Sequence, residues 1–122
     1  MSAVLKHSVM HEALRIAGEK VRRDRVIEVR FPYTGEVVAT VPKATVEDVK
    51  RAFRIAREYK PKLTRYERYR ILMRAGEIIA GRRDEIARLI TLEAGLCLKD
   101  STYEVGRASD APEDLISRES HG

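Results

Sequence analysis

The hydrophobic pattern of this sequence changes its period once, near Thr45. Before Thr45, short segments alternate between apolar and charged side chains, as strands with one buried face do. After it, apolar residues recur at intervals of three and four, which is typical of amphipathic helices. The change of period predicts an α+β chain in which β-hairpins come first and three to four helices follow.

Two hairpins are predicted in the first part of the chain. Gly18 can adopt the positive φ that a tight reversal demands, and the segment Pro32–Gly35 breaks the next extended region in the same way. Pro42 then ends the last strand, since proline cannot donate a backbone hydrogen bond. The four predicted strands are Ala13–Ile16, Glu19–Val21, Val26–Phe31 and Glu36–Val41.

The helices are predicted from their capping residues and their apolar faces. Thr45 can cap the first helix, Thr64 and Glu67 form a capping box for the second, Gly81 supplies a left-handed end for the second, and Gly95 ends the third. A weaker fourth helix is expected from about Leu98 to Ser109. The predicted inner faces are Val46, Val49, Ala52, Phe53, Ala56 and Tyr59 in the first helix, Tyr69, Leu72, Met73, Gly76, Ile79 and Ala80 in the second, and Ile86, Leu89, Ile90 and Ala94 in the third.

The length of 122 residues leaves room for one domain. We expect a mobile N-terminus at residues 1–12, a folded part at residues 13–110 and a mobile, polar tail at residues 111–122. No apolar run is long enough for a membrane span or a secretory signal, so the expected location is the cytoplasm. The single cysteine, Cys97, has no partner for an internal disulfide.

Basic residues are concentrated between residues 50 and 83, a stretch that contains twelve lysines and arginines but only three glutamates. Such a stretch could bind nucleic acid or an acidic protein, or it could be a solvated helix surface. Tyr59, Tyr66 and Tyr69 lie within it, as aromatic residues do on surfaces that bind single strands. Because Tyr59 and Tyr69 fall on the apolar faces, we interpret them as core residues, and nucleic acid is not the expected partner.

Several motifs with known chemistry are missing or incomplete. No Gly-x-Gly-x-x-Gly loop is present, so no dinucleotide-binding turn is predicted. His7 and His11 have the spacing of two metal ligands on a helix, but no third ligand lies nearby. The histidines are all near the termini, so nothing in the sequence activates Cys97, which we expect to be inert and partly buried.

The order of several segments resembles the beginning of aldehyde dehydrogenases. Residues 26–45, with Pro32-Tyr33-Thr34-Gly35 at their centre, are similar to the proline–glycine hairpin of that family. Three further segments resemble its first helices, namely residues 47–56, residues 68–79 and residues 83–95, the last of which ends in Leu92-Glu93-Ala94-Gly95 where the family usually has Glu-Thr-Gly or Glu-Ser-Gly. Residues 31–36 and 92–101 most resemble the phosphonoacetaldehyde dehydrogenase branch.

The resemblance implies a part of an α/β nucleotide-binding domain, whose helices would cover a sheet that these residues do not include. Complete relatives would oxidise an aldehyde with NAD or NADP as homo-oligomers, through a cysteine nucleophile and a glutamate base. In the family, these groups and the cofactor loop lie on later segments, so no catalytic, cofactor or metal residue is assigned here and the chain alone is expected to be inactive. The relatives' partner is a small aldehyde.

One site residue is carried over from the resemblance. The helix that contains residues 103–107 lies near the substrate tunnel in the family, and Arg107 could pair with a phosphonate through its guanidinium group. The other interpretation is a surface arginine. Two different functions stay open beside the enzyme family: a basic adaptor for nucleic acid or an acidic protein, and a scaffold that acts through its own helices.

Overall fold

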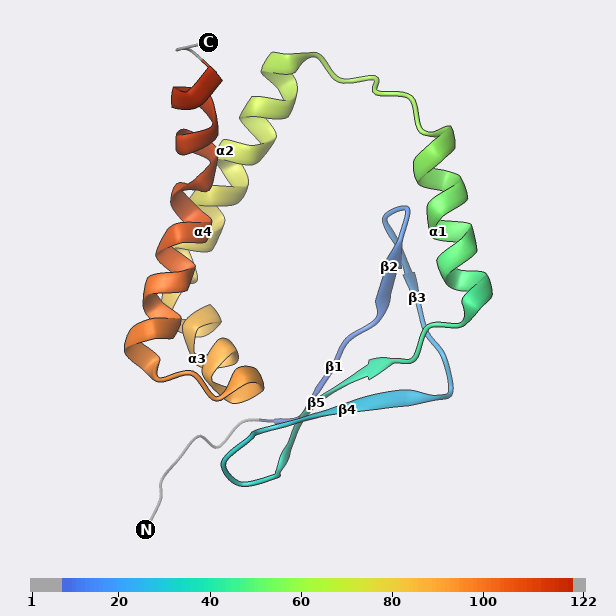
Figure 1. Cartoon of the computed structure of the whole chain (residues 1–122), viewed down its shortest axis with the longest axis vertical. Coiled ribbons are helices and arrows are strands. Elements are labelled where there is room, and N and C mark those ends of the chain that lie inside the picture. Colours follow the sequence, from blue (N-terminus) through green and yellow to red (C-terminus); the bar gives the residue numbers. More distant parts are fainter. Residues whose placement is uncertain (1–7, 120–122) are drawn as a thin grey trace. The chain divides into compact units, whose positions relative to one another are not determined.

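The computed structural model describes residues 8–119, and the chain divides into two compact units, Met1–Lys60 and Pro61–Gly122 (Figure 1). The first unit contains five short strands and one helix, and the second contains three helices. The predicted α+β class is therefore confirmed, with strands preceding helices along the chain.

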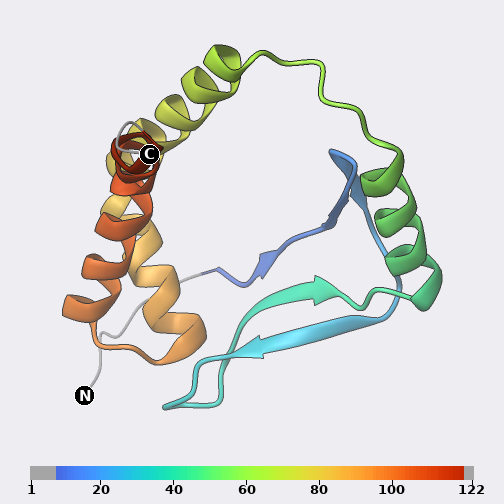
Figure 2. The ribbon, with the colours of Figure 1, turned by 45° about the horizontal axis from the view of Figure 1, so that its top comes forward.

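A three-stranded sheet forms the larger β-structure of the first unit, in the order β1-β5-β4 (Figure 2). Strands β4 (Val26–Arg30) and β5 (Val37–Pro42) make the second predicted hairpin, and Val38 and Ala39 of β5 are buried. Strand β1 (Met10–His11) pairs with β5 in parallel.

Strand β1 corrects the prediction that residues 1–12 are mobile. The backbone N–H of Glu12 donates to the carbonyl of Thr40 (3.1 Å), and Nδ1 of His11 lies 2.7 Å from Oγ1 of Thr40. The partner strand β5 is distant in sequence, so no local sequence pattern predicts these contacts. Residues 1–7, which include His7, lie outside the described part of the chain.

The first predicted hairpin is also confirmed. Strands β2 (Leu14–Ile16) and β3 (Glu19–Val21) pair antiparallel, with Ile16 opposite Glu19. Both turn residues have positive φ, 52° at Ala17 and 83° at Gly18. This is the geometry that two-residue hairpin turns require, and Ala17 adopts it at a steric cost that a glycine would avoid.

Helix α1 (Val46–Glu58) begins at Thr45, as predicted, but its apolar face is not where the chain packs. Asp48 is buried and Arg51, Ala52 and Ile55 are half-buried, so this side of the helix is turned inward. Of the predicted inner face only Ala52 is partly covered. The rest of that face is more apolar than the inward side of the helix, but no described element of the first unit covers it.

The second unit is formed by α2 (Arg65–Gly81), α3 (Arg83–Ala94) and α4 (Leu98–Glu119), with α4 packed against both of the others (Figure 2). The side chains buried between these helices are small or medium in size, and the hydroxyls of Thr91 and Ser101 are hydrogen-bonded there at 2.9 Å. Among the described side chains of this unit, the buried residues are Gly76, Ala87, Leu92, Ser101 and Val105.

The predicted inner faces of α2 and α3 are only partly correct. In α2, Gly76 is buried and Met73 and Ile79 are half-buried, whereas Tyr69, Leu72 and Ala80 are exposed. In α3, the predicted residues are half-buried except the exposed Ala94, and Ala87 and Leu92 are the buried ones. The inner face of α3 is thus rotated slightly from the predicted one, toward the side that meets α4.

The ends of two helices differ from the prediction. Gly81 does not take a left-handed conformation, because the N–H of Arg82 donates to the carbonyls of Ile78 and Ile79 and α3 starts at the next residue. Gly95 does, with a φ of 72°. Helix α4 does not stop near Ser109, as predicted, but continues to Glu119. Alanine, glutamate and leucine after Asp110 favour a helix, and Pro112 does not end it.

Candidate functional site

The apolar face of α1 is open to solvent. We call it the α1 stripe, and it comprises Val46, Val49, Phe53 and Tyr59, which are between 47% and 74% exposed. A helix face this apolar is normally buried against another element. Within the first unit, none of the described elements covers it, so the α1 stripe is a candidate contact surface.

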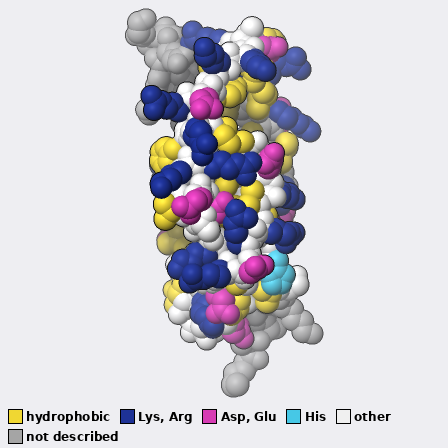
Figure 3. All heavy atoms as spheres, turned by 90° about the vertical axis from the view of Figure 1, so that its right-hand side faces the viewer, with side chains coloured by type: hydrophobic (Ala, Val, Ile, Leu, Met, Phe, Trp, Pro, Cys, Tyr) yellow, Lys and Arg dark blue, Asp and Glu magenta, His cyan; other side chains and the backbone are white. Residues whose placement is uncertain are grey.

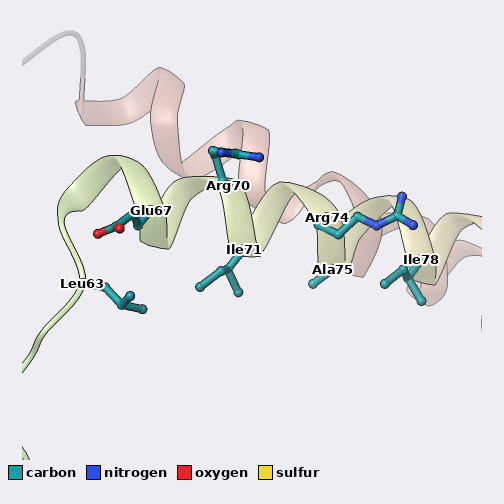
Figure 4. Close-up of a pocket in the computed structure, with 7 residues that line it drawn as sticks. All are labelled: Leu63, Glu67, Arg70, Ile71, Arg74, Ala75 and Ile78. Atoms are coloured by element: carbon teal, nitrogen blue, oxygen red, sulfur yellow. The ribbon is translucent and has the colours of Figure 1, made fainter.

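A second open apolar surface lies on α2. We call it the α2 groove, a hollow of about 590 Å³ along the helix (Figure 4). Four of its side chains are apolar and lie on one side of α2, and the charged residues flank them. The lining residues are Leu63, Glu67, Arg70, Ile71, Arg74, Ala75 and Ile78.

Sequence reasoning missed the α2 groove because it gave α2 a single apolar face. Ile71, Ala75 and Ile78 recur at intervals of four and three on the opposite side from Gly76, and Ile71 is 55% exposed. A helix that is apolar on two sides is normally buried between two layers. This spacing in the sequence is the signal that could have revealed the groove.

The charged groups around the α2 groove differ in their hydrogen bonds and ion pairs. Glu67 accepts hydrogen bonds from the backbone N–H and the hydroxyl of Thr64, at 2.7 and 2.8 Å, and these bonds lower its pKa. Nη1 of Arg74 lies 2.7 Å from a carboxylate oxygen of Glu77. Among the described residues, Arg70 has no hydrogen bond or ion pair. Figure 4 draws Arg70 on the opposite side of α2 from Ile71 and Ile78.

Asp48 holds the start of α1 against the first unit. Its carboxylate accepts bonds from Nε (3.0 Å) and Nη2 of Arg23, and from the backbone N–H of Thr45 at 2.9 Å. The bonds from Arg23 and Thr45 lower the pKa of Asp48 to about 2. The prediction of a Thr45 cap is confirmed, but the role of Asp48 was missed, since Arg23 is distant in sequence.

Arg107, the predicted substrate residue, is an exposed side chain on α4. Its Nη1 lies 3.3 Å from each carboxylate oxygen of Glu104, one turn earlier, so both residues are on the surface of the second unit. An ion pair of this exposure contributes little to stability. Its role toward a phosphonate stays a prediction.

Cys97 is exposed, not partly buried as predicted, because it lies in the short connection between α3 and α4. Of the histidines considered as its activators, His7 and His121 lie outside the described residues, and His11 belongs to the other unit. His11 is on strand β1 and not on a helix. Among the side chains of residues 8–110, no group of three could hold a metal ion.

The tyrosines of the basic stretch are exposed, which corrects the interpretation of Tyr59 and Tyr69 as core residues. Tyr59 and Tyr66 are more than 60% exposed and Tyr69 is 39% exposed, with the rings of Tyr66 and Tyr69 centred 6.2 Å apart. Lysine and arginine side chains surround exposed hydrophobic ones on the face drawn in Figure 3. Within the described helices, none is long and apolar enough to cross a membrane.

Comparison with known proteins gives one consistent family. The model of the aldehyde dehydrogenase family matches residues 19–118. Lactaldehyde dehydrogenase of Methanococcus aeolicus is 35% identical over 95 residues, and 3-sulfolactaldehyde dehydrogenase of Priestia megaterium is 32% identical over 102 residues. The NAD-dependent aldehyde dehydrogenase of Sinorhizobium meliloti has a similar fold, with a TM-score of 0.80 and 26% identity. The chain belongs to the aldehyde dehydrogenase family.

The matches cover most of this chain but a small part of each relative. They include 75% of the chain against the Methanococcus enzyme and 83% against the Priestia enzyme, but only 20% and 21% of those proteins. For the Sinorhizobium structure the shares are 87% and 23%. The chain thus spans about a fifth to a quarter of the length of the relatives that it matches.

Proposed function

We propose that this chain forms the first part of the nucleotide-binding domain of an NAD(P)-dependent aldehyde dehydrogenase subunit. Its contribution is structural, because its helices would cover a sheet that lies in the other segments of such a subunit. A cytoplasmic, homo-oligomeric enzyme belongs to the same proposal.

The observation that carries this proposal is the combination of family membership with two uncovered apolar surfaces. Phe53 in the α1 stripe is 74% exposed and Ile71 in the α2 groove is 55% exposed, although both lie on well-formed helices. Soluble domains rarely leave such surfaces open unless another element binds them. In the relatives, of which the matches cover only 20% and 21%, we propose that the additional chain supplies that element.

The chemistry of the family requires groups that we do not assign to these residues. Aldehyde oxidation needs a thiolate that adds to the carbonyl carbon, an acceptor for the hydride and a water activated for hydrolysis of the thioester. Cys97 is exposed between two helices, and no residue of the chain is assigned to activate it. We therefore propose that these 122 residues on their own neither bind NAD nor oxidise aldehydes.

For the substrate we propose a short aldehyde with an anionic group, with phosphonoacetaldehyde as the specific candidate. The segments at residues 31–36 and 92–101 support the phosphonoacetaldehyde branch by their resemblance. One of the similar relatives is named for 3-sulfolactaldehyde, which also carries an anion. Arg107 is the proposed partner of that anion, since a guanidinium group binds phosphonate or sulfonate through paired hydrogen bonds.

The test replaces the matched segment of the Priestia megaterium enzyme with this chain. We expect the chimera to oxidise its aldehyde with NAD or NADP, while the purified chain shows no turnover with phosphonoacetaldehyde and NAD. Turnover by the chain alone would refute the structural role. In an active chimera, Arg107→Gln should raise KM for an anionic aldehyde more than it changes kcat, and the exposed Arg88→Gln serves as the matched control. Equal effects of the two substitutions would remove Arg107 from the site.

A further inference from the structure

We propose that the hydrogen bond between the hydroxyls of Thr91 and Ser101 fixes the rotation of α4 on α3, and that this positions Arg107 for the anion of the substrate. Thr91 and Ser101 are then positioning residues, which act through Arg107 and do not touch the substrate. The inference rests on the proposed function, because it is there that Arg107 receives its ligand.

The hydroxyl pair lies where α3 meets α4. The two oxygens are 2.9 Å apart, Ser101 is fully buried and Thr91 is half-buried. Each hydroxyl is the other's hydrogen-bond partner, so removing one of them deprives the other of this bond. A buried, directional bond between two helices favours one arrangement of the helices over its alternatives.

Two other hydroxyls of α4 are used differently. Oγ1 of Thr102 donates to the carbonyl of Leu98 at 2.7 Å. Oγ of Ser109 donates to the carbonyl of Gly106 at 2.8 Å. Such bonds stay within one helix, as is common for serine and threonine. The bond of Ser101 crosses to α3 instead, so it depends on how the two helices are placed.

Apolar packing alone gives α4 little preference for one rotation. Among its side chains at residues 98–110, Ser101 and Val105 are the buried ones, and only Val105 is apolar. Leu98, at the start of the helix, is 52% exposed. One valine can pack over a range of helix rotations, whereas a hydrogen bond weakens steeply when its angle changes. The hydroxyl pair therefore determines which side of α4 faces α3.

A second contact from α3 is a weaker constraint. Nη2 of Arg83 lies 3.5 Å from the carbonyl oxygen of Thr102, which is at the limit of a hydrogen bond, and Arg83 is exposed. The bond between the buried hydroxyls is shorter and is shielded from water.

The rotation of α4 sets the direction of Arg107. Arg107 follows Val105 by two residues, which places it about 200° around the helix. With Ser101 and Val105 turned inward, Arg107 is turned outward, where its guanidinium group is exposed beside Glu104. A rotation of α4 by one residue position, about 100°, would turn Arg107 away from this direction.

The first test measures the position of residue 107 in the full 122-residue chain. A nitroxide is attached at Arg107→Cys in a Cys97→Ser background, since Cys97 is the single cysteine of the chain. NMR then records the paramagnetic relaxation of the amides of α2 and α3. Thr91→Val removes the hydroxyl and should change which of these amides relax fastest.

Two variants are the controls of this test. Thr91→Ser keeps the hydroxyl, and Thr102→Val removes a hydroxyl that bonds within α4, so both should preserve the parent pattern. Circular dichroism checks that each variant keeps its helices. Should Thr91→Val unfold, Ser101→Ala removes the other hydroxyl with little change of volume and should give the same altered pattern. An unaltered pattern without the hydroxyl bond overturns the proposal.

The second test measures catalysis in the chimera with the Priestia megaterium enzyme. Thr91→Val should raise KM for 3-sulfolactaldehyde at least about fivefold, as expected for coupled residues. KM for propanal, which carries no anion, should change much less. A loss of folded enzyme would instead lower kcat for both aldehydes. Equal changes of KM for the two aldehydes overturn the proposal.

A double substitution separates this proposal from the proposed function. In an Arg107→Gln background, Thr91→Val should have no further effect on KM, and additive effects would contradict the positioning role. An inactive chimera, or an Arg107→Gln variant with an unchanged KM, refutes the proposed function and the link to the substrate. The relaxation pattern then still decides whether the hydroxyl pair fixes α4.

Discussion

The carboxylate of Asp48 joins the start of α1 to the segment that follows β3. It completes the capping box of α1 with Thr45, and it pairs with Arg23, which follows the hairpin β2–β3. Arg51 of the same helix reaches Glu19 of β3, with Nη2 2.8 Å from the carboxylate. These polar contacts hold the inward side of α1, while its apolar stripe stays exposed.

The pKa of Asp48 is the most direct test of this arrangement. Because its pKa of about 2 lies below the usual value for aspartate, the folded state favours the ionised form. Its contribution to stability is present above about pH 4 and is lost as the pH falls through about 2. In an NMR titration, Arg23→Gln should raise the pKa of Asp48, and Arg51→Gln should leave it almost unchanged. A wild-type midpoint near 4 would contradict the described contacts.

Among the elements, α1 and β4 can be compared through the two phenylalanines of the chain, which differ in their exposure. Phe53 in the α1 stripe is 74% exposed, whereas Phe31, at the end of β4, is 8% exposed. We expect Phe53→Ser to reduce the binding of a hydrophobic dye and the self-association of the chain without loss of secondary structure. Phe31→Ser should cost about 3 kcal/mol of stability. Similar losses of structure in the two variants would show that the α1 stripe is already covered.

The basic stretch on α1 and α2 yields a prediction against the adaptor hypothesis. Its charges are dispersed over two helices in different units, and some are paired, as Arg51 with Glu19 and Arg74 with Glu77. We expect weak retention on heparin, with elution well below physiological salt and a shallow salt dependence. Tight retention with a steep salt dependence, reduced in Tyr66→Ala, would favour nucleic-acid binding instead.

The elements were largely predictable from local signals, and their neighbours were not. The change of period at Thr45, the capping box at Thr64 and the turn at Gly18 each depend on residues within a few positions, and the structure has all three features. The pairing of β1 with β5 and the bond from Arg23 to Asp48 join residues more than twenty positions apart. No periodicity reports such contacts, so they were missed.

For the candidate surfaces, too, the features that depend on nearby residues were predictable and the packing partners distant in sequence were not. The apolar faces of α1 and α2 could be read from the spacing of Val49, Phe53 and Ile71. Which side of each helix packs inside the chain depends on the other elements present. From the sequence, the α1 stripe was predicted to be buried, because apolar helix faces are normally buried. In this structure it is open, which is the outcome expected when the covering element lies elsewhere in a larger protein.

In the whole molecule, we propose that the α1 stripe and the α2 groove are both covered by other parts of an aldehyde dehydrogenase subunit. The two units carry their uncovered faces on α1 and α2 respectively. Two small units with open apolar surfaces should exchange their amide hydrogens quickly when they are alone, since little tertiary packing protects them. Packing within a complete subunit should slow this exchange.

The most direct measurement is therefore hydrogen exchange of α1 and α2 in two settings, the isolated chain and the chimera with the Priestia megaterium enzyme. We predict that the amides of residues 49–58 and 70–80 exchange at least about tenfold more slowly in the chimera, which corresponds to about 1.4 kcal/mol of added protection. Residues 37–41 of β5, already buried within their own unit, should change less. Equal exchange of α1 and α2 in the two settings would contradict the account.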